Sequence, residues 1–201
     1  MNKDWIKVEN FISEDICKLL YGYILLAQKR LSVTRDERYG TFNDSQSKGD
    51  LSMYGDLIFD TLLMGKVSQL QEITGEELVP QYSYYRLYNK GSELKRHTDR
   101  ESCEISLTLC LGYDSHYLWP IWFKDRDGNE IPIETDTGDM VIYKGCELEH
   151  WREPFRGNNH AQVFLHYKLK DGKYGNNYTD GRVTFGIPSP HDTRHWFRGK
   201  R

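Results

Sequence analysis

Residues 96–113 read RHTDRESCEISLTLCLGY and join a His-x-Asp pair to a run of alternating apolar residues. Alternation with a period of two is typical of a β-strand with one buried face. The face that we expect to be buried consists of Cys103, Ile105, Leu107, Leu109 and Leu111. The opposite face, which we expect to meet a barrel lumen or solvent, consists of Glu104, Ser106, Thr108 and Cys110. The stretch therefore predicts a strand that begins just after a candidate metal-binding pair.

Further strands are expected on both sides of this stretch, with helices before them. Short runs rich in aromatic and β-branched residues, bounded by Gly, Asn and Asp, occupy residues 82–88, 117–125, 131–134, 138–145 and 161–169. Apolar residues at helical spacing predict one helix over 16–31, with Ser13 as its N-cap, and another over 55–73. Two helices followed by about seven strands predict an antiparallel sandwich or open barrel with helices packed on one side.

The composition favours one domain in a reducing compartment. The chain has 201 residues and a formal net charge of −3, and it shows neither a signal-peptide pattern nor an apolar run long enough to span a membrane. We expect a single domain over 1–201, with a helical part at about 10–75, a β core at about 80–170 and an irregular tail at 171–201. The four cysteines form no CxxC pair, so we expect reduced thiols and a cytoplasmic location.

Three polar residues could form a metal site at the edge of this β structure. His97 and Asp99 are two positions apart, so they project to the same side if the segment is extended. His150 follows the predicted strand 138–145 and could supply a third ligand. Two histidines and one carboxylate leave part of the coordination sphere open, as in non-haem Fe(II) oxygenases, although zinc accepts the same ligands. A surface His-x-Asp pair and a half-buried histidine remain the alternative interpretation.

Several segments together resemble a known family. They are VENFISEDICKLL (8–20), YNKGSELKRHTD (88–99), ISLTLCLGY (105–113), WPIWF (119–123), TGDMVIYKG (137–145) and HWREPFRGNNHAQVFLHY (150–167). In these segments the chain resembles the Fe(II)/2-oxoglutarate-dependent oxygenases, nearest to the prolyl 4-hydroxylase-like branch. The resemblance implies a mainly β fold with N-terminal helices around a double-stranded β-helix core of the jelly-roll or cupin type.

The resemblance also implies an activity and its cofactors. Iron would be held by His97, Asp99 and His150. With 2-oxoglutarate and O2 as cosubstrates, the protein would hydroxylate a C–H bond of a peptidyl or small amino-acid-like substrate and release succinate and CO2.

The cosubstrate site departs from the pattern of the family. The branch carries Lys or Arg about ten residues after its second histidine, to hold the distal carboxylate of 2-oxoglutarate, and this chain has His160 there. A nearby anion favours protonated histidine, so we expect His160 to contact that carboxylate. Arg152 is the alternative, with Gln162 adding an amide donor from the face that also carries His160. Tyr88 lies close to where the family has a tyrosine that bonds 2-oxoglutarate, although its spacing to His97 is one residue shorter.

The long polar segment 33–52 shows no periodicity. Loops of this length in a compact domain are often functional, and a reactive metal centre has to be shielded from water. We therefore predict that this segment closes over the substrate, with a surface loop of no special role as the alternative.

Two other classes of function fit the same triad. The first is an oxygenase acting on nucleic-acid bases, which needs a basic groove; its candidate residues are Lys95, Arg96, Arg100 and the tail 194–201. The second is a zinc hydrolase or a non-catalytic metal-binding β-barrel. The mixed charges lead us to expect neither a nucleic-acid nor a membrane partner.

Overall fold

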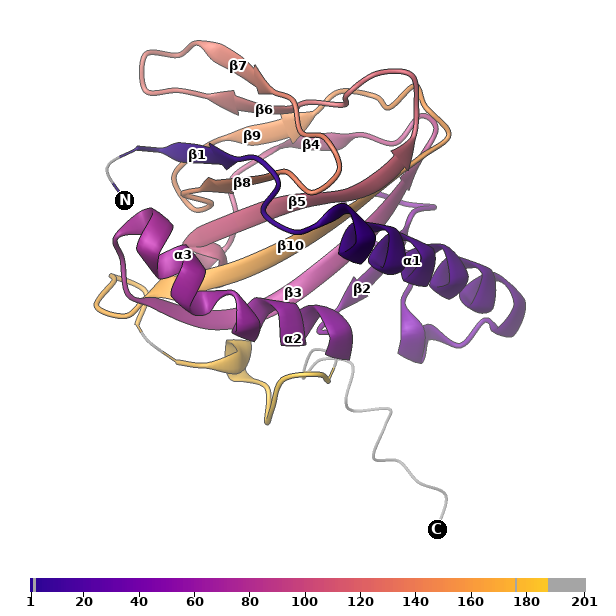
Figure 1. The fold of residues 1–201 in the computed structure, drawn as a ribbon, viewed down its shortest axis with the longest axis horizontal. Helices are drawn as coiled ribbons and strands as arrows, with labels where there is room; N and C mark the ends of the chain where they lie inside the picture. The colour runs from indigo at the N-terminus through magenta and orange to yellow at the C-terminus, as the bar shows by residue number, and fades with distance from the viewer. Residues whose placement is uncertain (2, 176, 188–201) are drawn as a thin grey trace.

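The structure is a computed structural model that describes residues 1, 3–175 and 177–187. These residues form two antiparallel sheets that lie one above the other, with three helices along the lower and right-hand sides of the larger sheet in the view of Figure 1. The six-stranded sheet has the order β1-β8-β5-β10-β3-β2, formed by Trp5–Val8, Met140–Tyr143, Ile105–Asp114, Asn159–Leu169, Leu78–Asn89 and Leu51–Tyr54. The four-stranded sheet has the order β4-β9-β6-β7, formed by Leu94–His97, His150–Arg152, Ile121–Lys124 and Glu130–Ile133.

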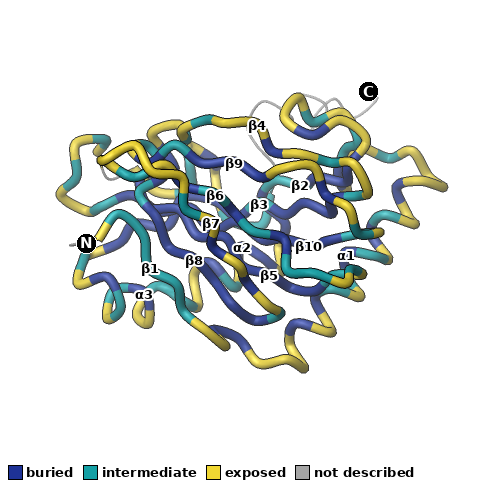
Figure 2. The backbone as a smooth tube through the Cα atoms, turned by 90° about the horizontal axis from the view of Figure 1, so that it is seen from above, coloured by how far each residue is buried: buried dark blue, intermediate teal, exposed yellow. Residues whose placement is uncertain are grey.

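The helices cover the outer face of the six-stranded sheet. They are α1 (Glu14–Thr34), α2 (Leu57–Gly65) and α3 (Val67–Thr74). The described residues also include three short 3-10 helices, η1 (Glu37–Tyr39), η2 (Glu101–Cys103) and η3 (Thr179–Gly181). Apolar side chains of the helices and of this face of the sheet form the largest core cluster. Figure 2 shows the buried residues concentrated along the strands and the exposed ones in the connecting segments. The predicted mainly β fold with N-terminal helices is confirmed.

Side-chain alternation in the central strands separates this core from the space between the sheets. β10 pairs with β3 on one side and with β5 on the other, so Gln162 lies opposite both Arg86 and Cys110. In β5, β10 and residues 82–88 of β3, odd-numbered residues such as Leu107 and Val163 pack toward the helices. The even-numbered residues of these segments face the four-stranded sheet, and we call the space that they line the lumen.

The prediction of buried and lumen-facing residues for 103–111 is confirmed from Ile105 onward. Cys103 is buried as predicted, but it belongs to η2 and not to the strand, and it lines the pocket side instead of the core beneath the helices. The alternation of the two faces begins only where β5 begins, so it does not include Cys103. The Sγ atom of Cys103 lies 3.0 Å from the hydroxyl oxygen of Tyr82. All four cysteines are free, as expected.

The helical predictions differ from the structure in their bounds. The first helix extends to Thr34, and Ser13 takes the N-cap position without a capping hydrogen bond from its side chain. The second predicted helix is two helices, because the chain breaks at Lys66, after Gly65. Glycine has low helix propensity and makes such a break inexpensive.

Four short strands were not predicted from the sequence: β1, β2, β4 and β9. Each has three or four residues, and their conformation depends on pairing with a neighbour more than on a local pattern. No helix in the described part of the chain is both long and apolar enough to cross a lipid bilayer. Most of the basic tail, including residues 194–201, lies outside the described residues.

Candidate active site

The three predicted metal ligands come together where β4 ends and β9 begins. His97 and His150 are register partners in the four-stranded sheet, which places their imidazole rings 4.3 Å apart. Asp99 lies two residues beyond the end of β4, and its Oδ1 is 3.5 Å from Nε2 of His97 and 3.6 Å from Nε2 of His150. One ligand atom from each residue lies within 4.8 Å of the other two. The cluster therefore has the size and the donor set of a three-ligand metal site.

Backbone carbonyls hold both imidazoles in one orientation. Nδ1 of His97 lies 2.8 Å from the carbonyl oxygen of Lys95, and Nδ1 of His150 lies 2.8 Å from that of Leu148. A hydrogen bond to a carbonyl requires a proton on Nδ1, so the neutral ring keeps the lone pair of Nε2 free. Metal-binding histidines are held by the same kind of outer partner. The residues present therefore fit a divalent cation.

Asp99 is held by groups around it. Its Oδ2 accepts a hydrogen bond of 2.7 Å from Ser106, and its backbone N–H donates to the carbonyl of Gly145 at 2.8 Å. A Cβ atom at Gly145 would lie 2.5 Å from Oδ2, so only glycine fits beside the carboxylate. Burial would raise the pKa of Asp99, but in the metal-free protein the adjacent imidazoles of His150 and His97, when protonated on both nitrogens, outweigh this effect, and the pKa lies well below its usual value.

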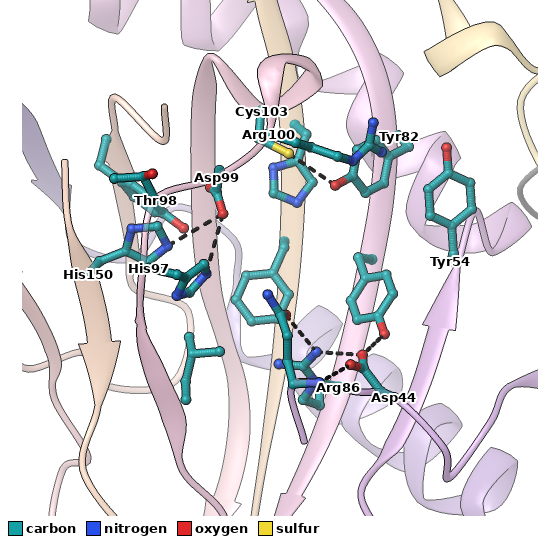
Figure 3. A pocket seen from close by; sticks show the side chains of 16 residues that line it. Asp44, Tyr54, Tyr82, Arg86, His97, Thr98, Asp99, Arg100, Cys103 and His150 are labelled. Atoms are coloured by element: carbon teal, nitrogen blue, oxygen red, sulfur yellow. Dashed lines mark hydrogen bonds and ion pairs between the residues drawn. The ribbon is translucent and has the colours of Figure 1, made fainter. Parts of the chain in front are cut away.

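A pocket of about 440 Å³ opens beside the three ligands. Figure 3 shows the triad on one side of it, Arg86 and Asp44 at another, and Tyr82, Arg100 and Tyr54 toward the third. The open side of the triad thus faces a space large enough for a small molecule or a side chain of a peptide.

The predicted loop 33–52 contributes to this pocket. Asp44 and Gln46 are among the residues that line it. Asp44 forms an ion pair of 2.6 Å with the buried guanidinium of Arg86 and accepts a hydrogen bond from Tyr84. Part of the loop is ordered differently from the prediction, because α1 extends into it, η1 follows and β2 begins at Leu51.

The four predicted cosubstrate residues lie together at another part of the lumen. Tyr88, Arg152, His160 and Gln162 are all buried. The amide of Gln162 is oriented by its neighbours: its nitrogen donates to Thr108 Oγ1 at 2.9 Å, and its oxygen accepts from His160 Nε2 at 2.5 Å and Arg152 Nη2 at 3.3 Å. Tyr88 accepts a hydrogen bond of 3.1 Å from Arg86.

His160 and Arg152 differ sharply in charge. Burial, and then the positive charge of Arg152, hold the pKa of His160 well below its usual value, so the imidazole is neutral. Arg152 has lost its contact with solvent, and its Nη1 donates to the carbonyl of Trp119 at 2.7 Å. Its Nε has no partner, and none of the ion pairs found among the described residues includes it. Within the part of the chain that the structure describes, Arg152 is therefore a buried cation without a compensating anion.

In sequence, no family model and no curated protein matches the chain. Solved structures do match. A prolyl-4-hydroxylase from Pseudomonas putida superimposes with a TM-score of 0.64 at 18% identity, over 84% of this chain and 94% of that chain. A prolyl hydroxylase from Trichoplax adhaerens, in complex with a hypoxia inducible factor peptide fragment, gives a TM-score of 0.63 at 12% identity, over 83% and 84% of the two chains.

The protein has the fold of the 2-oxoglutarate-Fe(II) oxygenases. HygX from Streptomyces hygroscopicus, solved with nickel and 2-oxoglutarate, shares it with a TM-score of 0.60 at 10% identity, over 89% of this chain and 85% of that one. The double-stranded β-helix inferred from the motifs is confirmed, and prolyl hydroxylases are among the structural neighbours, as the resemblance implied.

The sequence did not predict some of the pocket residues. Arg86 could have been found, because the alternation along 82–88 places it on one face with Tyr82, Tyr84 and Tyr88. Asp44 carries no such signal, because its position depends on how the irregular loop folds. The same holds for Asp180, which comes from the C-terminal segment and contacts the pocket residue Arg100.

Proposed function

We propose that the protein is an Fe(II)- and 2-oxoglutarate-dependent dioxygenase that hydroxylates a C–H bond of a peptidyl or small amino-acid-like substrate. The observation that carries this proposal is the convergence of two carbonyl-held imidazoles and one ionised carboxylate on the edge of a pocket. Two histidines and a carboxylate with open positions are the ligand set of non-haem Fe(II) oxygenases. The fold supports the same class of enzyme.

The triad has a defined division of roles in this proposal. His97, Asp99 and His150 would hold Fe(II), which activates O2 when bound while 2-oxoglutarate is converted to succinate and CO2. The carbonyls of Lys95 and Leu148 keep both Nε2 lone pairs available. Ser106 holds Oδ2 of Asp99, which leaves Oδ1 on the side of the imidazoles.

The cosubstrate would bind along the lumen with its distal carboxylate at Arg152. Arg152 is two residues from His150 on the same strand, so the two side chains share a face about 7 Å apart at their roots. An extended five-carbon chain, with four C–C bonds of roughly 1.5 Å, spans a similar distance. A carboxylate there would supply the anion that Arg152 lacks.

The other three residues of this group would shape the cosubstrate site. Neutral His160 fills the position of the cation in the family and orients Gln162. Tyr88 completes the wall beside Arg86. We thus propose that the cation that holds the distal carboxylate is Arg152 on β9, and that it replaces the Lys or Arg that the family has at the position of His160 on β10.

The class of substrate is supported by the pocket and by the neighbours. Both aromatic rings and ionic groups line the pocket. Such a lining suits an amino-acid-like substrate, which carries charged groups, better than a purely apolar substrate. Among the neighbours, the Trichoplax adhaerens enzyme was solved with a peptide fragment and HygX with hygromycin B. Asp44 places the loop 33–52 at this pocket, which supports its proposed role as a cover.

The alternative of a base-modifying oxygenase gains little support. One of its candidate cations, Arg96, is already paired with Glu130 at 2.6 Å. A groove for a nucleic-acid backbone requires cations free to meet phosphates. A zinc enzyme would use the same triad, so the choice of metal is decided by experiment.

The test is to measure Fe(II) binding and succinate formation together. Protein purified without oxygen should bind one Fe(II) and convert 2-oxoglutarate to succinate, slowly without substrate. Replacing His97, Asp99 or His150 by alanine should abolish both, while His116→Ala, an exposed histidine outside the site, should leave both unchanged. Normal iron binding by His97→Ala, or zinc-dependent hydrolysis without succinate formation, would disprove the proposal.

A further inference from the structure

The carboxylate of Asp180 lies where three side chains from other parts of the chain converge. Arg100 donates to it through Nη1 at 2.8 Å and Nη2 at 2.5 Å, and the hydroxyls of Ser102 and Tyr54 donate at 2.5 Å each. A guanidinium that binds with two parallel hydrogen bonds is the preferred partner of a carboxylate. Together, the donors form a complete carboxylate-binding site, and we call it the rim site.

The rim site belongs to the same pocket as the metal ligands. Arg100 and Tyr54 both line the pocket, and Arg100 follows Asp99 directly in the chain. The guanidinium carbon of Arg100 lies 4.6 Å from the centre of the Tyr82 ring, and that ring stacks on Tyr54 at 4.6 Å. Figure 3 shows Arg100 beside Tyr82, with Tyr54 next to them. A ligand bound at the rim site would therefore lie against an aromatic surface that leads to the triad.

The backbone that presents Asp180 is strained. Thr179 has a φ of 61° and Asp180 a φ of 54°, so two successive residues other than glycine are left-handed. This region is rare for such residues, and for a β-branched residue such as threonine it is an outlier. Strain of this kind persists where the surroundings enforce it, often at functional sites. The bonds to the rim site are the contacts that hold Asp180 in place.

The turn that carries Asp180 lies between two fixed points. Before it, the carbonyl of Asn177 accepts a hydrogen bond of 2.8 Å from Gln81. After it, Arg182 forms a fully buried ion pair of 2.7 Å with Asp60. Only residues 178–181 lie between these anchors, and they include Gly181, with a φ of 77°. The turn can release its carboxylate while the segment on either side remains attached to the fold.

We propose that Arg100, Ser102 and Tyr54 bind a carboxylate of the substrate, and that Asp180 occupies their site until the substrate displaces it. The substrate is then an amino-acid-like molecule or peptide that carries a carboxylate next to a group that packs on Tyr82. This inference rests on the proposed function only where it takes the bound carboxylate to be part of the enzyme's substrate. The anion site itself is independent of the oxygenase chemistry.

The experiment empties the rim site and offers it a small carboxylate. Asp180→Gly removes the carboxylate, and glycine accepts the left-handed backbone without strain. Acetate labelled with 13C is titrated into metal-free protein at constant ionic strength with chloride. Binding is followed by NMR through the acetate signal in every variant, and also through the Nε–Hε signal of Arg100 in the variants that keep this residue. We expect saturable binding to Asp180→Gly at least tenfold tighter than to the unaltered protein, in which Asp180 competes. The double variant Asp180→Gly/Arg100→Gln should not bind acetate.

One further variant keeps the outcome decisive. Asp180→Asn retains the shape of the turn but pairs less strongly with a guanidinium, so it should also bind acetate more tightly than the unaltered protein. Absence of saturable binding in both variants, or equal binding by the double variant, would overturn the inference. Neither iron nor 2-oxoglutarate is present in these titrations. Acetate binding without succinate formation would therefore reject the proposed function alone, and succinate formation without acetate binding would reject the rim site alone.

Discussion

Arg152→Met should separate the stability of the empty protein from its affinity for 2-oxoglutarate. Arg152 is buried, its Nε has no partner and no ion pair in the described part of the chain includes it. Replacing buried ionic groups by apolar side chains of similar volume is often neutral or stabilising by about 1–4 kcal/mol. The apoprotein should therefore become no less stable, while the distal carboxylate of 2-oxoglutarate loses its cation.

The expected loss of affinity follows from one charge-assisted hydrogen bond. Such a bond contributes about 1.5–3 kcal/mol, which corresponds to a rise in Kd of roughly 10- to 150-fold. At a 2-oxoglutarate concentration of 100 times the original Kd, the ligand stabilises the protein by about 2.7 kcal/mol, and after a 100-fold rise in Kd by only about 0.4 kcal/mol. For a chain of this size, the ligand-induced rise in Tm should fall from roughly 5–10 °C to about 1 °C.

The assay is calorimetry and thermal unfolding on Mn(II)-loaded protein without oxygen, so that no turnover interferes. Two comparisons make the result specific. His160→Ala should raise the Kd less than Arg152→Met does, because the imidazole is neutral. The double variant Arg152→Gly/His160→Lys, which returns the cation to β10, should recover affinity. Unchanged binding by Arg152→Met, or an equal or greater loss in His160→Ala, would refute the assignment of the cation to Arg152.

Three further predictions concern carboxylates outside the triad. Asp44→Asn should weaken the ion pair with Arg86 and lower the yield of hydroxylated product per succinate, while succinate formation without substrate persists; an unchanged yield would exclude the loop as a cover. Asp60→Asn should lower the free energy of unfolding in urea by about 3–5 kcal/mol, because it leaves Arg182 buried and unpaired; a change below 1 kcal/mol would contradict this. Burial would raise the pKa of Asp180, but hydrogen bonds from Arg100, Ser102 and Tyr54 outweigh it and lower the pKa to about 2. The ionised carboxylate should therefore add to the free energy of unfolding above about pH 4, and this contribution should vanish as the pH falls toward 2. Asp180→Asn should remove that part of the dependence of stability on pH.

The sequence was most informative where one local pattern predicted both a strand and which of its side chains are buried in the core. The alternation from Ile105 to Leu111 correctly separated the core side of β5 from the lumen side, because a sheet with one face on a core tolerates no shift by one residue. The residue pattern offered His97 and Asp99 as a pair and His150 as a candidate third ligand, the resemblance assigned iron to them, and the fold brings the three together. Local spacing alone could pair only the first two.

The sequence was least informative where charge balance depends on distant segments. Arg152 and His160 lie on different strands, and their relative charges follow from burial in the same lumen. Asp44 and Asp180 come from an irregular loop and a C-terminal turn, and each meets its arginine across at least 42 residues of sequence. No period or motif encodes such contacts, which exist only after the sheets have formed.

The pairing of β4 with β9 gives the metal a mechanical role. These strands meet in register at only two positions, Leu94↔Arg152 and His97↔His150, with an irregularity between them, and β4 forms the edge of its sheet. A cation held by His97 and His150 would cross-link the two strands where their main-chain pairing is sparse. Without it, the edge strand and the turn that carries Asp99 should exchange amide hydrogens faster than the long strands β3, β5 and β10. The supply of iron would then govern how long the folded protein survives proteolysis, as well as how fast it works.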